Sequence, residues 1–349
     1  MQNNMQIYKD MDRDRLIEIL NRIGGVKIGL IGDICLDVYW RADMRKSELS
    51  RETPHYPLPV IEERMSPGGG ANAAANMAAL EPKRVEVFGA VGSDWRGREL
   101  TRLLKELGLG LSGIVCDVSC VTNAYIKPLR KGFSDVIYED PRLDFTSYDS
   151  ISSYVEDKLI AALDSAAADL DILCVSDQMP FGVITKRVRE HICGLARGGL
   201  RVVADSRCNI AEFAGCTIKP NELEGANAVG LDPAGLYNIE DFARTAKILV
   251  EKIHGDVFMT LGDRGSLFVG ERQAWHIPGH SISGAIDICG AGDSSLSGFG
   301  LSLAAGAKPW EAARIAGLCS EVTIRQIGVT GTASREQILE RHSELTARA

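Results

Sequence analysis

The segment Asp287–Asp293, with the sequence Asp-Ile-Cys-Gly-Ala-Gly-Asp, places an acidic side chain behind a glycine-lined turn that runs into a helical pattern over residues 294–305. The glycines let the backbone approach an anion, and the free N–H groups at a helix start attract negative charge. Phosphate would repel the carboxylate of Asp293 unless that group takes a proton from an attacking hydroxyl. The segment therefore indicates phosphoryl transfer, with Gly290, Ala291 and Gly292 as an anion hole. The alternative is a common glycine turn with an aspartate cap.

Two carboxylates follow the first apolar run, Val26–Ile31, which reads as a buried strand. Asp33 and Asp37 would then lie at the carboxyl end of that strand, where ligands bind in open α/β sheets. A carboxylate can accept hydrogen bonds from two hydroxyls, so one of the pair is expected to hold a sugar. Either residue could instead cap a loop.

A glycine-rich motif at residues 68–76 opens an alanine-rich helix. Gly69 and Gly70 permit backbone contact with a small polyol, and Asn72 offers both a donor and an acceptor to its hydroxyls. Close helix packing is the alternative. The motif also contains Gly-x-Gly-x-x-Ala, but Arg64–Pro67 precedes it where a dinucleotide fingerprint requires a strand, and no acidic residue stands out about 20 residues later.

Two further motifs follow predicted strands. Asn221 and Glu224 are three residues apart, which places them on one face of a helical turn, although the same spacing also forms a capping box. Thr260, Gly262 and Gly265 form a strand-to-hairpin turn, which alone is only a turn signal.

In this order the motifs resemble the ribokinase-like (PfkB) carbohydrate kinase family, from about residue 27 to residue 332. Within that family, residues 32–40, 50–54, 57–60 and 67–72 are most similar to the kinase half of the bifunctional heptose phosphate kinase and adenylyltransferase. The resemblance implies that ATP and Mg²⁺ are used and favours Asp37 as the sugar ligand. It also implies roles for three groups of residues: Asn221 and Glu224 at magnesium, partly through water; Thr260, Gly262 and Gly265 along the nucleotide; and Asp293 as the base.

Strands alternate with helices along most of the chain, which predicts a single α/β domain over residues 1–349 with a mostly parallel central sheet and helices on both faces. Residues 38–66 and 120–145 break this alternation and look like strands without intervening helices. The resemblance implies that they form a small β-sheet lid over the sugar, which can also serve as a homodimer contact.

Composition excludes several classes of protein. The net charge is −8 and no block of Lys and Arg is present, so a nucleic-acid partner is not expected. The chain shows neither a signal-peptide core nor an apolar stretch of about 18 residues, which predicts a soluble cytoplasmic protein without membrane contact. The nine cysteines lack paired spacing, so reduced thiols are expected, with a lowered pKa possible only for Cys289 at the helix start. His276 and His280 are expected in a surface loop, because Pro278 and Gly279 separate them.

The expected function is ATP-dependent phosphorylation of a hydroxyl on a sugar or sugar phosphate. Thr53–Tyr56 and Lys131–Asp135 depart from the heptose kinase pattern, which leaves the sugar open. Alternatives are a kinase for a nucleoside or another small alcohol, a non-catalytic sugar or nucleotide sensor, and, more distantly, a nicotinamide oxidoreductase. The sequence also leaves open whether a monovalent cation is needed near Asp287.

Overall fold

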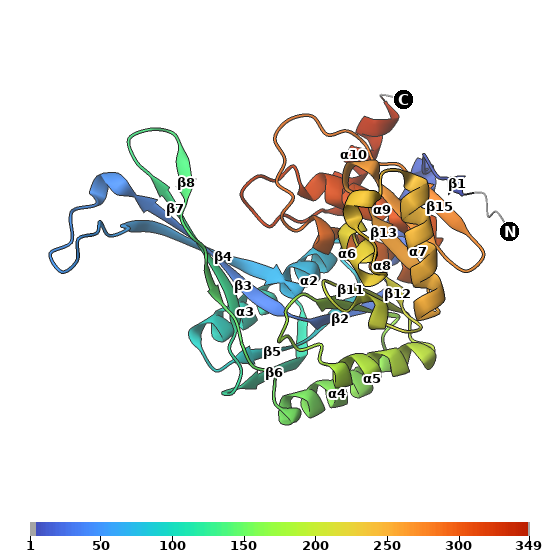
Figure 1. Cartoon of the computed structure of the whole chain (residues 1–349), viewed down its shortest axis with the longest axis horizontal. Coiled ribbons are helices and arrows are strands. Elements are labelled where there is room, and N and C mark those ends of the chain that lie inside the picture. Colours follow the sequence, from blue (N-terminus) through green and yellow to red (C-terminus); the bar gives the residue numbers. More distant parts are fainter. Residues whose placement is uncertain (1–4, 348–349) are drawn as a thin grey trace.

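The computed structural model describes residues 5–347 and contains one large sheet, one small sheet and ten α-helices within that range (Figure 1). The large sheet has ten strands in the order β1-β15-β14-β13-β12-β11-β10-β2-β5-β6, and it is parallel except at β14, which runs antiparallel to both neighbours. Its strands are β1 (Gln6–Ile7), β2 (Lys27–Gly32), β5 (Arg84–Gly92), β6 (Gly110–Asp117), β10 (Ile172–Asp177), β11 (Val202–Ser206), β12 (Thr217–Ile218), β13 (Val257–Thr260), β14 (Ser266–Val269) and β15 (Ala274–Ile277). The expected fold class is confirmed.

Helices cover both faces of this sheet, and the strands alternate their apolar side chains between two separate cores. On β2, Ile28 and Leu30 belong to one core, whereas Ile31 belongs to the other. This alternation is the period of a strand buried on both faces. The first core is closed by α1 (Arg13–Ile23), α2 (Gly70–Ala79), α3 (Trp95–Glu106), α8 (Ala291–Ala304), α9 (Pro309–Thr323) and α10 (Arg335–Thr346). The second is closed by α4 (Ser153–Ala167), α5 (Lys186–Arg197), α6 (Glu222–Ala228) and α7 (Ile239–Ile253).

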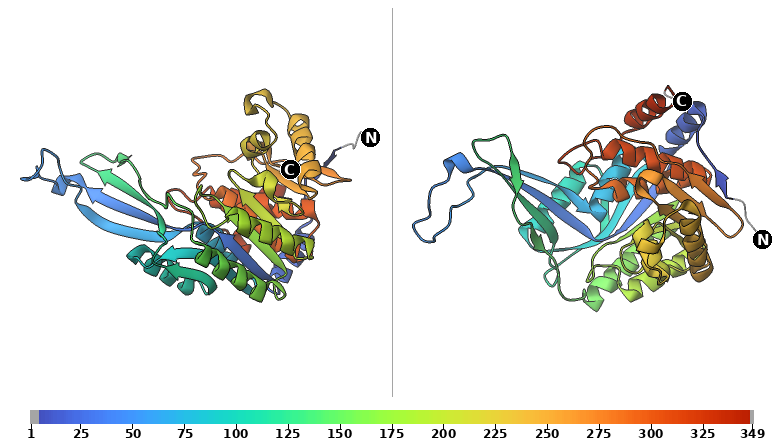
Figure 2. Two further views of the ribbon diagram at one scale, coloured as in Figure 1. Left: turned by 60° about the horizontal axis from the view of Figure 1, so that its bottom comes forward. Right: turned by 45° about the horizontal axis from the view of Figure 1, so that its top comes forward.

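The small sheet projects from the body of the molecule, as all three views show (Figures 1 and 2). It consists of β3 (Ile34–Asp43), β4 (Val60–Gly69), β7 (Asn123–Lys131), β8 (Ile137–Glu139) and β9 (Leu143–Phe145). The two segments expected to form a lid, 38–66 and 120–145, supply nearly all of these strands. We call this sheet the lid.

The register of the lid decides which of its side chains share a face. Asp37 pairs with Ser66 on β4 and with Tyr125 on β7. Two residues further along, Tyr39 pairs with Arg64 and Lys127 in the same way. Because side chains two residues apart lie on the same face of a strand, these two rows form one continuous polar surface.

The N-terminal end of the described chain adds an edge strand that the sequence analysis did not anticipate. Gln6 and Ile7 pair in parallel with Trp275 and His276 of β15. The expectation of a surface loop for His276 is therefore wrong: the residue lies in a strand, with its Nε2 3.0 Å from the carbonyl of Arg264. No helix within residues 5–347 is long and apolar enough to cross a membrane.

Candidate active site

A cavity of about 720 Å³ lies at the carboxyl ends of β11, β12 and β13. Ligands bind at this edge of open parallel sheets. The cavity brings together residues from three of the motifs that were separated in sequence. The predicted residues among its lining are Asn221, Glu224, Thr260, Gly262, Gly265, Gly290, Ala291, Gly292 and Asp293.

The glycine turn at the start of α8 requires a glycine at position 290. Gly290 has a φ of 80°, and a Cβ added there would lie 2.9 Å from Nδ2 of Asn72. The first hydrogen bond of α8 runs from Ser294 N to Gly290 O (3.0 Å), so the amides of Gly292 and Asp293 precede the helical ladder. These N–H groups and the dipole of a 14-residue helix favour an anion at this place.

The carboxylate of Asp293 has the properties of a base that works near neutral pH. Burial raises its pKa to about 7, helped by the negative charge of Asp205 and opposed by the hydrogen bond from Asn72 and by the ammonium of Lys219. Nδ2 of Asn72 donates a hydrogen bond to Oδ2 of Asp293 at 2.7 Å. The glycine-rich motif at the start of α2 is therefore in direct contact with the predicted base. A carboxylate with such a pKa can exchange a proton with a hydroxyl at physiological pH.

The two aspartates that the sequence could not distinguish have different environments. Asp33 is 1% exposed, and its oxygens accept backbone N–H groups from Gln178, Met179 and Val183, each at 2.8 Å. These bonds connect the residue between β2 and β3 to the segment after β10, and they leave the carboxylate little capacity for a sugar. This geometry makes Asp33 an unsuitable ligand for the substrate.

Asp37 has no protein hydrogen bond to its side chain among the described residues. It lies on the lid, and a Cβ added to Gly68 would come within 2.8 Å of its carboxyl group. Burial raises its pKa, while Lys127, Arg142 and Arg64 act in the opposite direction. Because no described side chain or backbone N–H group occupies its oxygens, Asp37 is the free acceptor of the pair. Gly69 and Gly70 lie beside Asp33 instead, with Gly70 N donating to Asp33 O at 2.9 Å.

Comparison with known proteins agrees with this arrangement. Residues 211–336 match the pfkB family carbohydrate kinase profile. The chain is 30% identical over 336 residues to the bifunctional protein HldE of Citrifermentans bemidjiense, and 31% identical over 334 residues to that of Bradyrhizobium diazoefficiens. These alignments cover 95% and 93% of this chain, but only 66% and 65% of the relatives. The chain therefore contains a pfkB family carbohydrate kinase domain.

Solved structures show the same fold at lower sequence identity. Arabidopsis thaliana ribokinase, solved with ribose and ATP, superposes with a TM-score of 0.69 at 17% identity and covers 91% of this chain and 99% of its own. Phosphofructokinase-2 from Escherichia coli, solved with potassium, gives a TM-score of 0.71 at 19% identity, with 92% and 99% covered. Both likenesses establish a ribokinase-like fold.

Within the region that matches the pfkB profile, Asn221 and Glu224 cap α6 reciprocally. Asn221 N donates to Glu224 Oε2 and Glu224 N donates to Asn221 Oδ1, both at 2.8 Å. The capping interpretation is thus correct, but it does not exclude a binding role, because both residues also line the cavity. Burial, followed by the charge of Asp205, raises the pKa of Glu224.

The donor set of the cavity suits a magnesium ion that keeps most of its water. Asp205, Glu224 and Asp293 present carboxylates to it. Within residues 5–347, however, no group of three or more His, Cys, Asp or Glu side chains is close enough to hold a metal directly. Magnesium binds well through one or two carboxylates plus water and substrate phosphates. The residues present therefore fit an ion that arrives with the nucleotide.

Two cations beside Asp37 were missed by sequence reasoning. The Nζ of Lys127 lies 3.2 Å from the hydroxyl of Tyr39 and 4.8 Å from the centre of its ring. The guanidinium of Arg142 stacks 4.2 Å above the ring of Tyr125 and forms a bidentate pair with Asp144. Burial disfavours the charge of Lys127, but Asp37 raises its pKa. Only the strand register, which the sequence does not display, places these groups together.

The side chain of Asp287 stabilises the turn before Gly290 by accepting two backbone hydrogen bonds. Asp287 accepts a hydrogen bond from Cys289 N at 3.0 Å and another from Gly328 N at 3.1 Å. The alternative of a lowered pKa for Cys289, suggested by its position at the helix start, does not hold. Burial raises the pKa of that thiol, and the aspartates around it add to the effect against the opposing charge of Lys127.

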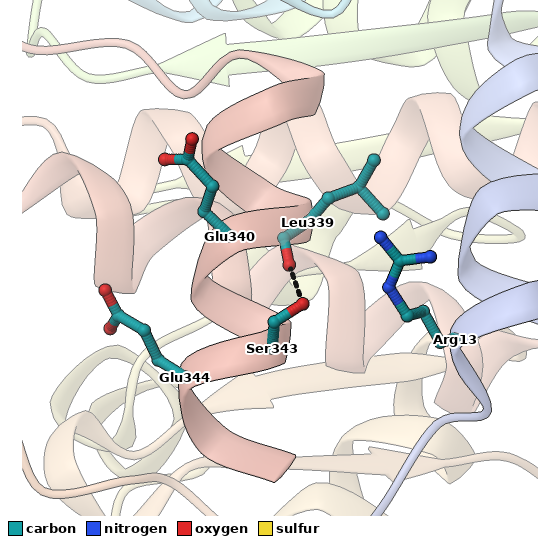
Figure 3. A pocket seen from close by; sticks show the side chains of 5 residues that line it. All are labelled: Arg13, Leu339, Glu340, Ser343 and Glu344. Carbon is teal, nitrogen blue, oxygen red and sulfur yellow. Dashed lines mark hydrogen bonds between the residues drawn. The ribbon is translucent and has the colours of Figure 1, made fainter. Parts of the chain in front are cut away.

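A second hollow of about 550 Å³ lies between the start of α1 and α10 (Figure 3). It is lined by Arg13, Leu339, Glu340, Ser343 and Glu344. The hydroxyl of Ser343 donates to the carbonyl of Leu339 at 2.9 Å, so this polar group is already satisfied within the helix. None of the predicted site residues lies there.

Proposed function

We propose that the chain transfers the γ-phosphoryl group of ATP to a hydroxyl of a sugar or sugar phosphate. The observation that carries the proposal is the carboxylate of Asp293. It has a pKa of about 7 and is hydrogen-bonded to Asn72. It also lies one residue behind the glycine turn, in the cavity that holds the expected nucleotide motifs. A sensor would have no use for a base at this place.

Asp293 takes the proton of the substrate hydroxyl as that oxygen attacks the γ-phosphorus. The P–O bond to ADP breaks while the new bond forms, and the proton remains on the carboxylate. The amides of Gly292 and Asp293 donate to the phosphoryl oxygens as charge develops on them. Asn221 and Glu224 would hold the hydrated magnesium ion, which supplies positive charge to the phosphates when bound.

The lid surface supports a sugar that already carries a phosphate. Asp37 provides an acceptor for sugar hydroxyls. Lys127 and Arg64 lie on the same face, and within residues 5–347 neither has a carboxylate partner within 4.0 Å. Two cations without carboxylate partners around one carboxylate leave net positive charge for a substrate anion. A heptose phosphate, the substrate that the sequence resemblance implies, has this combination of hydroxyls and phosphate.

The lid also supports homodimer formation. Its outer segments expose large apolar side chains, including Phe133 (94% exposed), Ile137 and Tyr138. Exposed apolar surface on a projecting sheet is typical of a protein–protein contact. Light scattering at micromolar concentration should give the mass of two chains. A single-chain mass would exclude a stable dimer.

The experiment that tests the function is release of ADP from Mg-ATP in the presence of hexoses, pentoses, sugar phosphates including heptose phosphates, and nucleosides. We expect one strong response among the sugars or sugar phosphates, abolished in Asp293→Asn. A response to a nucleoside alone would establish the other kinase alternative. Binding of ATP without any response would favour the sensor.

A further inference from the structure

Lys219 is a buried cation at the phosphate end of the cavity. It directly follows β12 and is 3% exposed, and its Nζ donates to Oδ2 of Asp205 at 2.7 Å. Asp205, at 6% exposed, is almost as deeply buried. A buried lysine normally tends to lose its charge. Here burial does act in that direction, but Asp205 raises the pKa of Lys219 above its usual value, so the ammonium stays charged.

The ammonium lies next to the predicted anion hole. A Cβ added to Gly292 would be 3.8 Å from Nζ of Lys219. Among the described residues that line the cavity, the only Lys and Arg side chains are Lys219 and Arg314. The guanidinium of Arg314 is held against the ring of His280, at 2.8 Å from Nε2. Lys219 is thus the cation placed at the glycine turn.

The hydrogen-bonding capacity of this ammonium is not used up. An ammonium group has three N–H donors, and the bond to Asp205 is the one hydrogen bond that Nζ of Lys219 makes within residues 5–347. Leaving charged donors unpaired in a buried place is unfavourable unless a ligand accepts them. The nearby oxygens of a phosphoryl group would be suitable acceptors.

We propose that Lys219 is a catalytic residue whose ammonium donates to an oxygen of the γ-phosphoryl group during transfer, and that Asp205 is the positioning residue that holds it. The inference rests on the proposed function. The negative charge on the phosphoryl oxygens grows where the amides of the glycine turn and this ammonium converge. Such preorganised charge stabilises the transition state more than the ground state.

A purely structural role for the pair is the competing explanation, because the ion pair also joins β11 to the residue after β12. The two explanations differ in what they predict for kcat and KM. Loss of a donor to the phosphoryl group lowers kcat and leaves the KM for the sugar little changed, whereas a purely structural pair leaves the kcat of the folded double variant near that of wild type.

The test compares wild type, Lys219→Met, Asp205→Asn and the double variant Lys219→Met/Asp205→Asn, using the sugar substrate found in the ADP-release panel. Removal of one partner leaves a buried unpaired charge and can prevent folding, whereas the double variant removes both charges. Lys186→Met, whose side chain is 82% exposed, serves as the control. We expect kcat to fall about 10²- to 10³-fold in Lys219→Met and in the double variant, as for the loss of one transition-state donor. The KM for the sugar should change little, and the control should match wild type.

The outcomes separate this inference from the proposed function. If wild type transfers no phosphoryl group to any acceptor, the proposed function fails and the inference fails with it. If wild type is active and the folded double variant keeps its kcat, the proposed function stands and Lys219 has only a structural role. A lowered kcat in the folded double variant, with the KM for the sugar little changed, supports the inference.

Discussion

The raised pKa of Asp293 predicts that the residue destabilises the folded protein at neutral pH, so that Asp293→Asn should be more stable than wild type. The pKa is about 7 in the fold and 3.8 in an unconstrained aspartate. Because the folded state binds this proton more tightly, the stability contributed by protonation is present at low pH and is lost as pH rises from about 4 to 7. The neutral asparagine has no such dependence.

The size of the effect follows from the pH interval. Between pH 5 and the folded pKa of about 7 lie about two units, each worth about 1.4 kcal/mol. The advantage of the variant over wild type should therefore be larger at pH 8 than at pH 5 by at most about 3 kcal/mol, and water in the cavity reduces this to about 1–3 kcal/mol. With an unfolding entropy of about 2.1 cal/mol/K per residue over 349 residues, this corresponds to roughly 1–4 °C in Tm.

Scanning calorimetry of both proteins without nucleotide, at pH 5 and pH 8, measures this difference. Asp149→Asn is a suitable control, because Asp149 is exposed and is not among the residues that line the cavity. The reasoning would be refuted by a Tm difference between Asp293→Asn and wild type that is the same at both pH values, or that is larger at pH 5.

Three further substitutions test individual side chains. Lys127→Met should raise the KM for a phosphorylated sugar about tenfold or more, because a charge-assisted hydrogen bond is lost. The KM for the unphosphorylated sugar should rise less. An equal rise in both KM values would contradict phosphate recognition by Lys127. Glu224→Gln should raise the magnesium concentration needed for half-maximal rate, because it removes a carboxylate near the ion. An unchanged magnesium titration would contradict a role of Glu224 in holding magnesium. Asp33→Asn should cost about 1–3 kcal/mol in urea unfolding, because the NH2 of asparagine cannot accept the buried N–H groups that one carboxylate oxygen accepts now, while KM for the sugar stays constant. A stable variant with a raised KM would return Asp33 to the sugar site.

The sequence was informative where chemistry depends on residue type at short spacing. The glycine turn before Asp293 and the strand-to-helix motif at Asn221 could be located because glycine, aspartate and asparagine have strong local conformational preferences. The alternation of strands and helices then implied that the carboxyl ends of parallel strands meet at one edge. The cavity lined by both motifs agrees with that reasoning.

The sequence was uninformative where the site depends on contacts between distant segments. Asp33 and Asp37 are equivalent by spacing, and only the position of the segment after β10 shows that Asp33 is occupied by backbone N–H groups. Lys127 meets Asp37 through the pairing of β3 with β7, and a shift of one residue would have turned it to the other face. The short strand β1 carries too few residues to show a period at all.

The measurement that tests the central claim most directly is the pH dependence of kcat/KM for sugar-dependent ADP release, with Mg-ATP binding followed in parallel. If Asp293, with a pKa of about 7, must be ionised to act as the base, the ionised fraction falls from about 0.9 at pH 8 to about 0.1 at pH 6. We therefore predict a roughly tenfold decrease in kcat/KM over this interval with Mg-ATP still bound, and a rate at least about 10²-fold lower in Asp293→Asn at every pH. A flat profile from pH 6 to pH 8, or near-normal turnover in Asp293→Asn, would contradict the account.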